Sequence, residues 1–388
     1  RLYFASNTLW QTLDGAQAWT QISPDLTRTD SIVPPSVGVY SNTPNALRHH
    51  PGVIYTIAPR HVKTDWIWVG TDDGLIHVTR DGGATWTDVT PQQIRSKPWS
   101  KVSIMDASHT DTLTAYAAIN TIRLDDLNPH LYVTHDGGRS WTEIVNGIPG
   151  GGATNTIKED PVRKGLLFAG TEQTVYFSID DGAHWQTLRN NLPATSIRDL
   201  VIKDNDLIVG THGRGFWILD DISPLRQMDA STSAASATLY APGDAWRFRW
   251  NRWTDTPLPA DEPAGQNPPE GAILYYSLAE AARGPVTLEV LDASGALVRR
   301  FSSTDVPAPM LEGQQVPPLW VRPAETVSAA AGMHRFVWDL HYGDLNGVRQ
   351  GYPISAIAGY TPAEPRGPIA MPGNYTVRLT VNGSSQTQ

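Results

Sequence analysis

The chain contains no cysteine, which excludes a disulfide framework and any cysteine-ligated zinc site. Its apolar runs are all shorter than the roughly 18 residues that a membrane-spanning helix needs, and we identify no signal peptide among these residues. Positive charge is also scarce, because the formal net charge is −9, whereas a dedicated nucleic-acid binder usually carries a basic patch. We therefore expect no membrane span and no nucleic-acid partner.

The common catalytic motifs are missing as well. The sequence has no Gly-x-Ser-x-Gly nucleophile elbow, no P-loop and no His-Glu-x-x-His zinc motif. His49 and His50 are adjacent, so in a strand they would point to opposite faces and would not share a metal ion. We expect neither a cofactor nor a bound metal, and we assign no catalytic residue.

Glycine, proline and tryptophan are abundant, with 33, 30 and 14 residues in a chain of 388. Many turns combined with many aromatic residues are typical of an all-β protein. The length allows two domains, or one large β domain with an accessory.

One short motif occurs four times in the first half of the chain. Its pattern is [Ser/Thr]-x-Asp-x-Gly-x-x-Trp, and only the first copy departs from it, with Ala16 in place of glycine. The aspartate and tryptophan of the four copies are Asp14 and Trp19, Asp81 and Trp86, Asp136 and Trp141, and Asp180 and Trp185. A unit that recurs in this way is typical of a solenoid, a propeller or another repeat array.

Each motif copy is interpreted as a hairpin turn between two strands. Aspartate accepts hydrogen bonds from turn amides, and glycine supplies a backbone conformation that costs other residues more. Tryptophan carries a large apolar area. We therefore predict a structural role for the four aspartates and burial of the four tryptophans between neighbouring sheets.

A second repeat supports the first, because Gly70-Thr71 recurs as Gly170-Thr171 and Gly210-Thr211. It predicts a last unit over about 197–219, which lacks the aspartate motif, as an atypical terminal repeat would. Residues 1–226 then hold about five blades of a propeller, the first of them partial. We expect the ring to be incomplete in this chain, so that an N-terminal segment or a partner chain covers its open blade.

The second half of the chain predicts a linker and a further β domain. Residues 227–270 are rich in alanine, serine and threonine at their start and in proline at their end, which is typical of a linker with bridging strands at 238–240 and 245–250. Residues 271–388 alternate apolar runs with turns such as 292–295, so they predict a β-sandwich that is truncated at its C-terminus. Residues 324–332 are predicted to form a helical turn.

The four motif copies resemble the Asp-box, or BNR repeat, of sialidases, xyloglucanase-type glycosidases and sortilin-type receptors. Residues 210–221, 267–272, 332–339 and 372–379 resemble stretches of bacterial sortilin-like proteins, which are often labelled glycosyl hydrolases. The resemblance implies an all-β fold in which an Asp-box propeller is followed by an Ig-like or fibronectin-like β-sandwich. It also implies an exported protein, either secreted or periplasmic.

The loops opposite the Asp-box turns form the predicted binding surface. In a four-stranded blade, the loop after the second strand and the loop that leads to the next blade share one end, and loops on a rigid scaffold concentrate binding residues. The residues that we assign to this face are Asp72, Asp73, Trp99, Arg123, Asp125, Asp126, Glu172, His212 and Arg214. Aspartate and arginine offer directional hydrogen bonds and tryptophan offers a stacking surface, although turn formation alone also explains Asp72 and Asp73.

Three functions remain open on these residues. The first is an exported scaffold that recognises a carbohydrate or a polypeptide on this face. The second is part of a glycoside hydrolase, which needs two carboxylates about 5–10 Å apart. We can assign neither such a pair nor the arginine motif of sialidases, so some catalytic groups would lie outside this chain. The third is a purely structural or assembly role.

Overall fold

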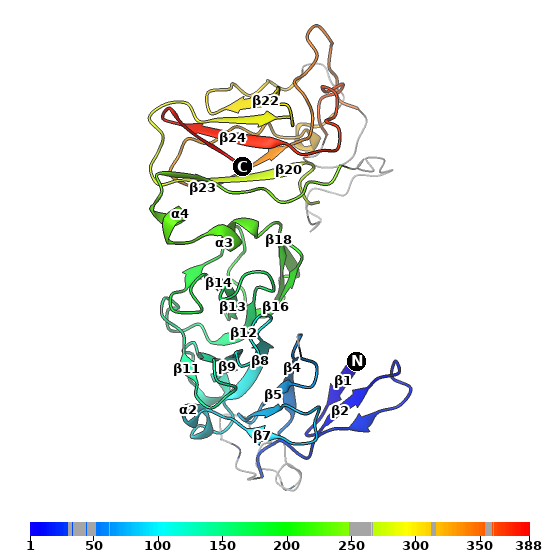
Figure 1. Cartoon of the computed structure of the whole chain (residues 1–388), viewed down its shortest axis with the longest axis vertical. Helices are drawn as coiled ribbons and strands as arrows, with labels where there is room; N and C mark the ends of the chain where they lie inside the picture. The colour runs from blue at the N-terminus through cyan, green and yellow to red at the C-terminus, as the bar shows by residue number, and fades with distance from the viewer. Residues whose placement is uncertain are drawn as a thin grey trace. The chain divides into compact units, whose positions relative to one another are not determined.

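The computed structural model describes residues 1–29, 33, 44, 52–61, 63–247, 265, 267–311, 316–353, 359 and 361–388. His49 and His50 lie outside the described residues. The chain is all-β, as the sequence predicts, and divides into two compact units, Arg1–Arg226 and Gln227–Gln388 (Figure 1). In the described part, no helix is both long enough and apolar enough to cross a membrane.

The first unit consists of five antiparallel sheets in chain order, each an up-and-down meander of the kind found in β-propeller blades. Blade 1 holds β1 (Leu2–Ala5), β2 (Leu9–Thr12) and β3 (Thr20–Gln21), and blade 2 holds β4 (Ile54–Pro59), β5 (Ile67–Thr71), β6 (Ile76–Thr79) and β7 (Thr87–Asp88). Blade 3 holds β8 (Lys101–Ala107), β9 (Ala115–Asn120), β10 (Leu131–Thr134) and β11 (Thr142–Glu143), and blade 4 holds β12 (Thr154–Glu159), β13 (Leu167–Thr171), β14 (Val175–Ser178) and β15 (Gln186–Thr187). Blade 5 holds β16 (Ile197–Lys203), β17 (Asp206–Thr211) and β18 (Phe216–Leu219). Two short helical turns, α2 (Gln92–Arg95) and η2 (Ile122–Leu124), lie in the loops.

The middle blades are buried on both faces, which explains their continuous apolar strands. The first strands β4, β8, β12 and β16 contact one another in sequence, so each blade packs on the next. In blade 2, Ile67 and Val69 pack with residues of blade 1, whereas Trp68 packs with residues of blade 3. Alternate residues of one strand therefore serve two different interfaces.

Close packing between blades accounts for the repeated glycines of the Gly-Thr pairs. A Cβ atom on Gly70 would lie 2.2 Å from a methyl carbon of Val102 in the first strand of blade 3. A Cβ atom on Gly170 would lie 2.6 Å from a methyl carbon of Ile197 in the first strand of blade 5. Any larger residue at these two positions would push neighbouring blades apart.

The tryptophans of the second, third and fourth motif copies join each blade to the one before it. Their indole Nε1 atoms donate to backbone carbonyls of the preceding blade at 2.8 Å in all three cases. The pairs are Trp86 with Ile22, Trp141 with Val89, and Trp185 with Ile144. The predicted burial is wrong for Trp19, which is 39% exposed. The described residues supply no earlier blade for Trp19, and its ring lies against Phe4 instead, with ring centroids 6.2 Å apart.

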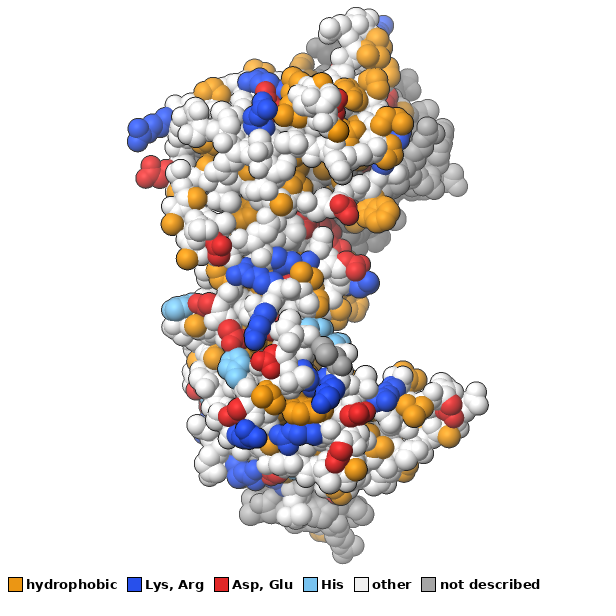
Figure 2. Space-filling view, viewed as in Figure 1, with side chains coloured by type: hydrophobic (Ala, Val, Ile, Leu, Met, Phe, Trp, Pro, Cys, Tyr) orange, Lys and Arg blue, Asp and Glu red, His pale blue; other side chains and the backbone are white. Residues whose placement is uncertain are grey.

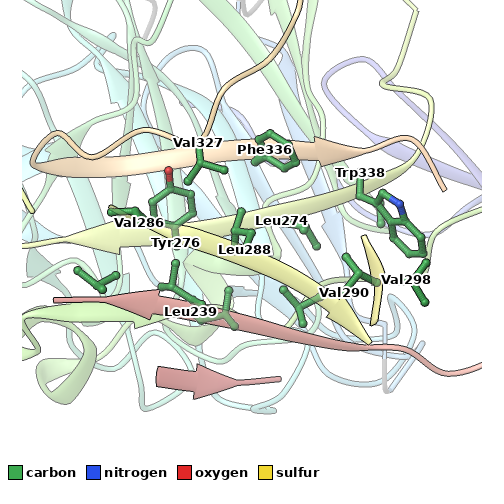
Figure 3. Close-up of a cluster of buried hydrophobic side chains, with 14 of the residues drawn as sticks. Leu239, Leu274, Tyr276, Val286, Leu288, Val290, Val298, Val327, Phe336 and Trp338 are labelled. Carbon is green, nitrogen blue, oxygen red and sulfur yellow. The ribbon is translucent and has the colours of Figure 1, made fainter. Parts of the chain in front are cut away.

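The second unit consists of two antiparallel sheets that share one apolar core. One sheet has the order β19 (Ala237–Leu239), β20 (Ala272–Leu278), β23 (Gly332–Trp338), and the other has the order β22 (Leu297–Ser302), β21 (Thr287–Leu291), β24 (Thr376–Val381), β25 (Ser384–Thr387). Figure 3 shows the side chains of Leu274, Tyr276 and Phe336 from the first sheet and of Leu288 from the second sheet in one buried cluster. The turn η3 (Pro318–Trp320) lies in a connecting loop.

Three local predictions for the second half need correction. The alanine- and serine-rich start of the predicted linker follows α3 (Ser223–Gln227) and contains α4 (Ala230–Ala234). The α4 helix forms because the Asp229 side chain accepts from the Thr232 amide while the Thr232 hydroxyl accepts from the Asp229 amide, a reciprocal cap. Residues 324–332 contain no helical turn, and residues 245–247 of the predicted strand 245–250 are not in a strand, while 248–250 lie outside the described residues.

Candidate functional site

All nine predicted binding residues lie at one end of the blades, which we call the loop face. It comprises the loops after the second strand of blades 2 to 5 and the segment 89–100 that leads from blade 2 to blade 3. The Asp-box turns lie at the opposite end, because each connects the last two strands of its blade. Figure 2 shows acidic and basic side chains interspersed over the visible side of the first unit.

The Asp-box carboxylates are committed to their own turns. Asp81 accepts from the amide and hydroxyl of Thr85 and from the Thr79 hydroxyl. These hydrogen bonds, that of the Thr85 hydroxyl first, lower the pKa of Asp81 to about 2. Asp136 has the same arrangement with Ser140, which lowers its pKa to about 2. Such acids hold a loop in shape and leave little capacity for a ligand.

Three of the predicted loop-face residues, Asp72, Trp99 and Arg123, form one cluster between blades 2 and 3. Asp72 accepts from the Val53 amide at 2.8 Å and from Arg123 Nη1 at 3.2 Å. The Arg123 guanidinium carbon lies 6.0 Å from the centroid of the Trp99 ring. Trp99 is only 5% exposed, so the expectation that its ring offers a stacking surface to a ligand is wrong. The Trp99 ring instead makes a cation–π contact with the Arg123 guanidinium.

Asp73 is a structural residue rather than a ligand-facing one. Its carboxylate accepts from the hydroxyl of Thr71 and from the amide of Arg28. Burial raises the pKa of Asp73 in spite of these hydrogen bonds. Since the residue is fully enclosed, it holds the loop after β5 against an earlier part of the chain.

Glu172 belongs to a second cluster, which the sequence did not reveal. The Asn120 side chain donates to Asn155 at 2.8 Å, Asn155 donates to Glu172 at 3.0 Å, and Arg198 Nη1 lies 3.3 Å from the same Glu172 oxygen. The four first strands β4, β8, β12 and β16 each shift register at the same place, and the residues at the shifts are Tyr55, Ser103, Asn155 and Arg198. A β-bulge of this kind changes the direction of a side chain. The residue types in the sequence do not predict where such a bulge occurs.

The remaining predicted residues lie farther along the same face. Asp126 pairs with Lys97 at 3.6 Å and with His130 at 3.2 Å. Asp125 ends η2 in the left-handed conformation with a φ of 57°, and its side chain is exposed. His212 and Arg214 are exposed on the turn between β17 and β18. In the described structure, neither side chain makes a hydrogen bond or ion pair with the other predicted residues.

Three Lys or Arg ion pairs of the loop face share one polarity, with the cation outside and the acid recessed. Side-chain exposure is 38% for Arg123 and 10% for Asp72, 45% for Arg198 and 23% for Glu172, and 58% for Lys97 and 22% for Asp126. We refer to Lys97, Arg123 and Arg198 as the cationic face. It directs positive charge to solvent although the chain as a whole carries −9.

A separate hollow of about 740 Å³ lies between blades 2 and 3 on their outer side. Its walls come from β7, α2 and the Asp-box turn of blade 3, and they include Asp88, Gln92, Arg139 and Trp141. Asp88 already pairs with Arg95 at 2.6 Å, and the Trp141 Nε1 already donates to a carbonyl. None of the nine predicted residues lines this hollow.

A buried acid lies near the opposite ends of β8 and β12. Asp106 accepts from the Glu159 amide at 2.8 Å and lies 3.8 Å from Lys158 Nζ. Burial raises the pKa of Asp106 to about 6, although Lys158 and His61 act in the other direction. The His61 ring stacks on the His109 ring at 3.8 Å, and burial lowers the pKa of both.

This arrangement predicts a pH-dependent penalty at Asp106. The folded-state pKa of about 6 exceeds the unfolded value of about 3.9, so ionisation costs stability progressively as pH rises from 4 to 6. Asp106→Asn keeps an acceptor for the Glu159 amide but cannot ionise. The unfolding free energy of the variant minus that of the wild type should therefore increase by up to roughly 3 kcal/mol between pH 4 and pH 7. Denaturant titrations across this range measure it, and a constant difference would contradict the prediction.

The comparisons with known proteins concern the fold alone. No protein-family model matches the chain, and no curated protein matches it. The chain is similar to the following solved structures. The GH74 xyloglucanase from Xanthomonas campestris aligns at 18% identity and a TM-score of 0.41, over 59% of this chain and 35% of that chain. YCF48 from Cyanidioschyzon merolae aligns at 17% identity and 0.34, over 43% and 52%. An ancestral GH74 enzyme aligns at 13% identity and 0.39, over 76% and 36%. The chain spans about half or less of each of these, and scores this low transfer neither a site nor an activity.

Proposed function

We propose that the first unit is an exported recognition scaffold whose cationic face binds an acidic segment of a polypeptide. The outward polarity of its three ion pairs is the observation that carries the proposal. The proposal also covers a relation to sortilin-like proteins, which the resemblance of the motif copies suggests. It further covers a secreted or periplasmic location.

The recessed acids prepare the cations for binding. Asp72 and Glu172 are themselves fixed by the Val53 amide and by the Asn155 side chain. An arginine that is held in place by a fixed carboxylate loses less conformational entropy when it binds a ligand carboxylate, and its planar fork retains free N–H donors for that ligand. The face is therefore pre-organised for carboxylates rather than neutralised.

A polypeptide suits this face better than a neutral carbohydrate does. Sugar rings stack on exposed aromatic faces, but Trp99 is enclosed. Tyr55 is half exposed, and Lys101 Nζ lies over its ring at 4.4 Å from the centroid. An extended acidic peptide needs only charged groups at intervals, which Arg123 in blade 3 and Arg198 in blade 5 provide.

The glycoside hydrolase is the weaker alternative. Hydrolysis needs two accessible carboxylates about 5–10 Å apart. On the loop face, Asp72 and Glu172 are each bound to an arginine and to a further donor, Asp126 pairs with Lys97 and His130, and Asp73 is enclosed. Among the five predicted carboxylates this leaves only Asp125 exposed without such an ion pair in the described structure. A purely structural role accounts for the recessed acids but not for the outward cations.

Peptide binding by charge-matched variants tests the proposal. The probe is a fluorescent peptide of ten glutamates, compared with a glycine-serine peptide of equal length, a polygalacturonate oligomer and a xyloglucan oligosaccharide. We expect Arg123→Ala and Arg198→Ala each to weaken glutamate-peptide binding roughly three- to tenfold, since a partly exposed charge contributes about 0.5–1.5 kcal/mol. Arg214→Ala should weaken it less.

The matched control is Arg139→Ala, which removes an exposed arginine from the Asp-box turn of blade 3. Thermal melts should be similar for Arg198→Ala, Arg214→Ala and Arg139→Ala, because exposed substitutions usually cost within about 0.5 kcal/mol. Arg123→Ala should melt somewhat lower, since it removes the ion-pair partner of the recessed Asp72 carboxylate. Asp72→Ala is not a suitable variant, since it would strand the Val53 amide. Equal effects of Arg139→Ala and Arg123→Ala, or preference for either saccharide, would refute the proposal.

A further inference from the structure

His130 lies between two carboxylates at the edge of the loop face. Its Nε2 atom is 3.2 Å from Asp126 Oδ2, in the loop that follows η2, and its Nδ1 atom is 2.7 Å from Glu143 Oε1, in β11. Neighbouring strands fix its main chain, because its amide donates to the Thr154 hydroxyl and its carbonyl accepts from the Ile119 amide. The ring is therefore held where it bridges the two acids.

Both contacts of this ring are hydrogen bonds only when the ring carries two protons. A neutral imidazole has one N–H donor and one bare nitrogen, whereas an imidazolium donates from both nitrogens. An ionised carboxylate can only accept, so in the neutral form one of the two acids faces a lone pair. Histidine is the side chain whose charge ordinarily changes between pH 5 and 8. The bridge at His130 therefore depends on a proton that is exchanged in this range.

The Asp126 oxygen that faces His130 also faces a member of the cationic face. Lys97 Nζ lies 3.6 Å from Asp126 Oδ2, while the other carboxylate oxygen accepts from the amide and the side chain of Asn128 at 3.1 and 2.9 Å. The side chains of Asp126 and His130 are recessed, whereas that of Lys97 is 58% exposed. His130 and Lys97 thus share one recessed negative charge, and Lys97 is the partner that solvent and ligands reach.

The other groups around the ring do not supply a substitute for its proton. Glu143 also takes a hydrogen bond from Tyr132 in β10, and burial raises the pKa of this phenol, so Tyr132 stays neutral. Thr154 in β12 is uncharged. Among the described residues, no cation besides Lys97 and His130 pairs with Asp126 or Glu143.

We propose that the proton on His130 regulates the cationic face by controlling whether Asp126 retains Lys97. This regulation rests on the proposed function, because it takes the cationic face to be the site for an acidic peptide. A charged ring neutralises Asp126, so Lys97 is released toward the carboxylates of the ligand. A neutral ring leaves Lys97 as the cation beside Asp126, and the face loses one positive charge. Since coupling between two bound ligands is reciprocal, peptide binding should in turn favour protonation of His130.

Peptide affinity at pH 6 and pH 8 measures this regulation. The probe is the fluorescent ten-glutamate peptide, which stays largely ionised at both values because the glutamate side chain has a reference pKa of about 4.3. We expect the 388-residue chain to bind it roughly three- to tenfold more tightly at pH 6, the effect of one partly exposed charge. His130→Gln cannot take up the proton and should bind with nearly equal affinity at the two values.

Two further variants identify the groups that respond. His212→Gln is the matched control, because it removes another histidine that is exposed on the loop face, and it should keep most of the pH dependence. Lys97→Ala should remove at least half of the pH dependence. Since Lys97 is largely exposed, this variant keeps the test decisive if His130→Gln disturbs blade 3.

Nuclear magnetic resonance of the free protein separates this proposal from the proposed function. Without peptide, the Lys97 Nζ resonance should shift between pH 6 and pH 8 in parallel with the His130 ring nitrogens, and the shift should be absent in His130→Gln. If the two signals move together but the peptide binds at neither pH, the proposed function fails while the coupling between His130 and Lys97 stands.

Three results would overturn the regulation and leave the proposed function in place. The first is peptide binding of equal affinity at pH 6 and pH 8. The second is a pH dependence that His130→Gln retains in full, and the third is a Lys97 signal that does not follow the His130 ring.

Discussion

Trp185→Ala should lower the free energy of unfolding by about 3–5 kcal/mol, the usual cost of truncating a buried tryptophan. Trp185 is 4% exposed, packs in the core between blades 3 and 4, and donates to the Ile144 carbonyl at 2.8 Å. The substitution removes both the apolar contact and this hydrogen bond. Urea titration followed by tyrosine fluorescence and circular dichroism measures the change.

The matched control is Trp19→Ala, at the same position of the first motif copy. Trp19 is partly exposed and lies against Phe4 rather than against an earlier blade. Its loss should cost about 1 kcal/mol or less, as expected for a partly exposed side chain away from the core. If the two variants lost similar amounts of unfolding free energy, the contact with the preceding blade would not be what makes the motif tryptophan stabilising.

Asp160→Asn should also destabilise the first unit by about 3–5 kcal/mol, because it leaves a buried guanidinium without its counter-charge. Asp160 is fully buried and holds Arg226 through three hydrogen bonds, of 2.7 and 3.1 Å to Nε and 2.9 Å to Nη2. It also accepts from the Arg163 amide at 3.1 Å. Denaturation at neutral pH gives the cost.

Asp204→Asn provides the comparison for this substitution. The Asp204 side chain pairs with Lys203 at 3.0 Å, but both are largely exposed, and an exposed pair contributes at most about 1 kcal/mol. Asparagine tolerates the positive φ of 54° at this position. A loss below about 1 kcal/mol for Asp160→Asn, equal to that of Asp204→Asn, would show that the buried pair does not fix Arg226 in place.

The fold class could be predicted from the sequence because local chemistry determines the repeated turn. Asp81 and its three counterparts accept from amides within five residues, so the motif carries its own explanation. The exposure of Trp19 could not be predicted in that way. Its burial depends on a preceding blade, and a local motif says nothing about its neighbours.

The candidate site was predictable in place but not in detail. Blade topology put Asp72, Arg123 and Glu172 at one end of the sheets. No local pattern predicts that Trp99 is enclosed, because its burial results from contacts between distant loops. Asn155 and Arg198 were missed for a related reason: a register shift turns them toward Glu172, and such shifts depend on strand pairing rather than on residue type.

The salt dependence of glutamate-peptide binding, combined with hydrogen exchange, tests the central claim most directly. If the cationic face binds carboxylates, affinity should fall steadily as salt rises from 50 to 300 mM. Protection should appear in the loop 121–130 and around Arg198, and Arg123→Ala should flatten the salt dependence. Affinity that is insensitive to salt, or protection confined to the Asp-box turns, would contradict the account.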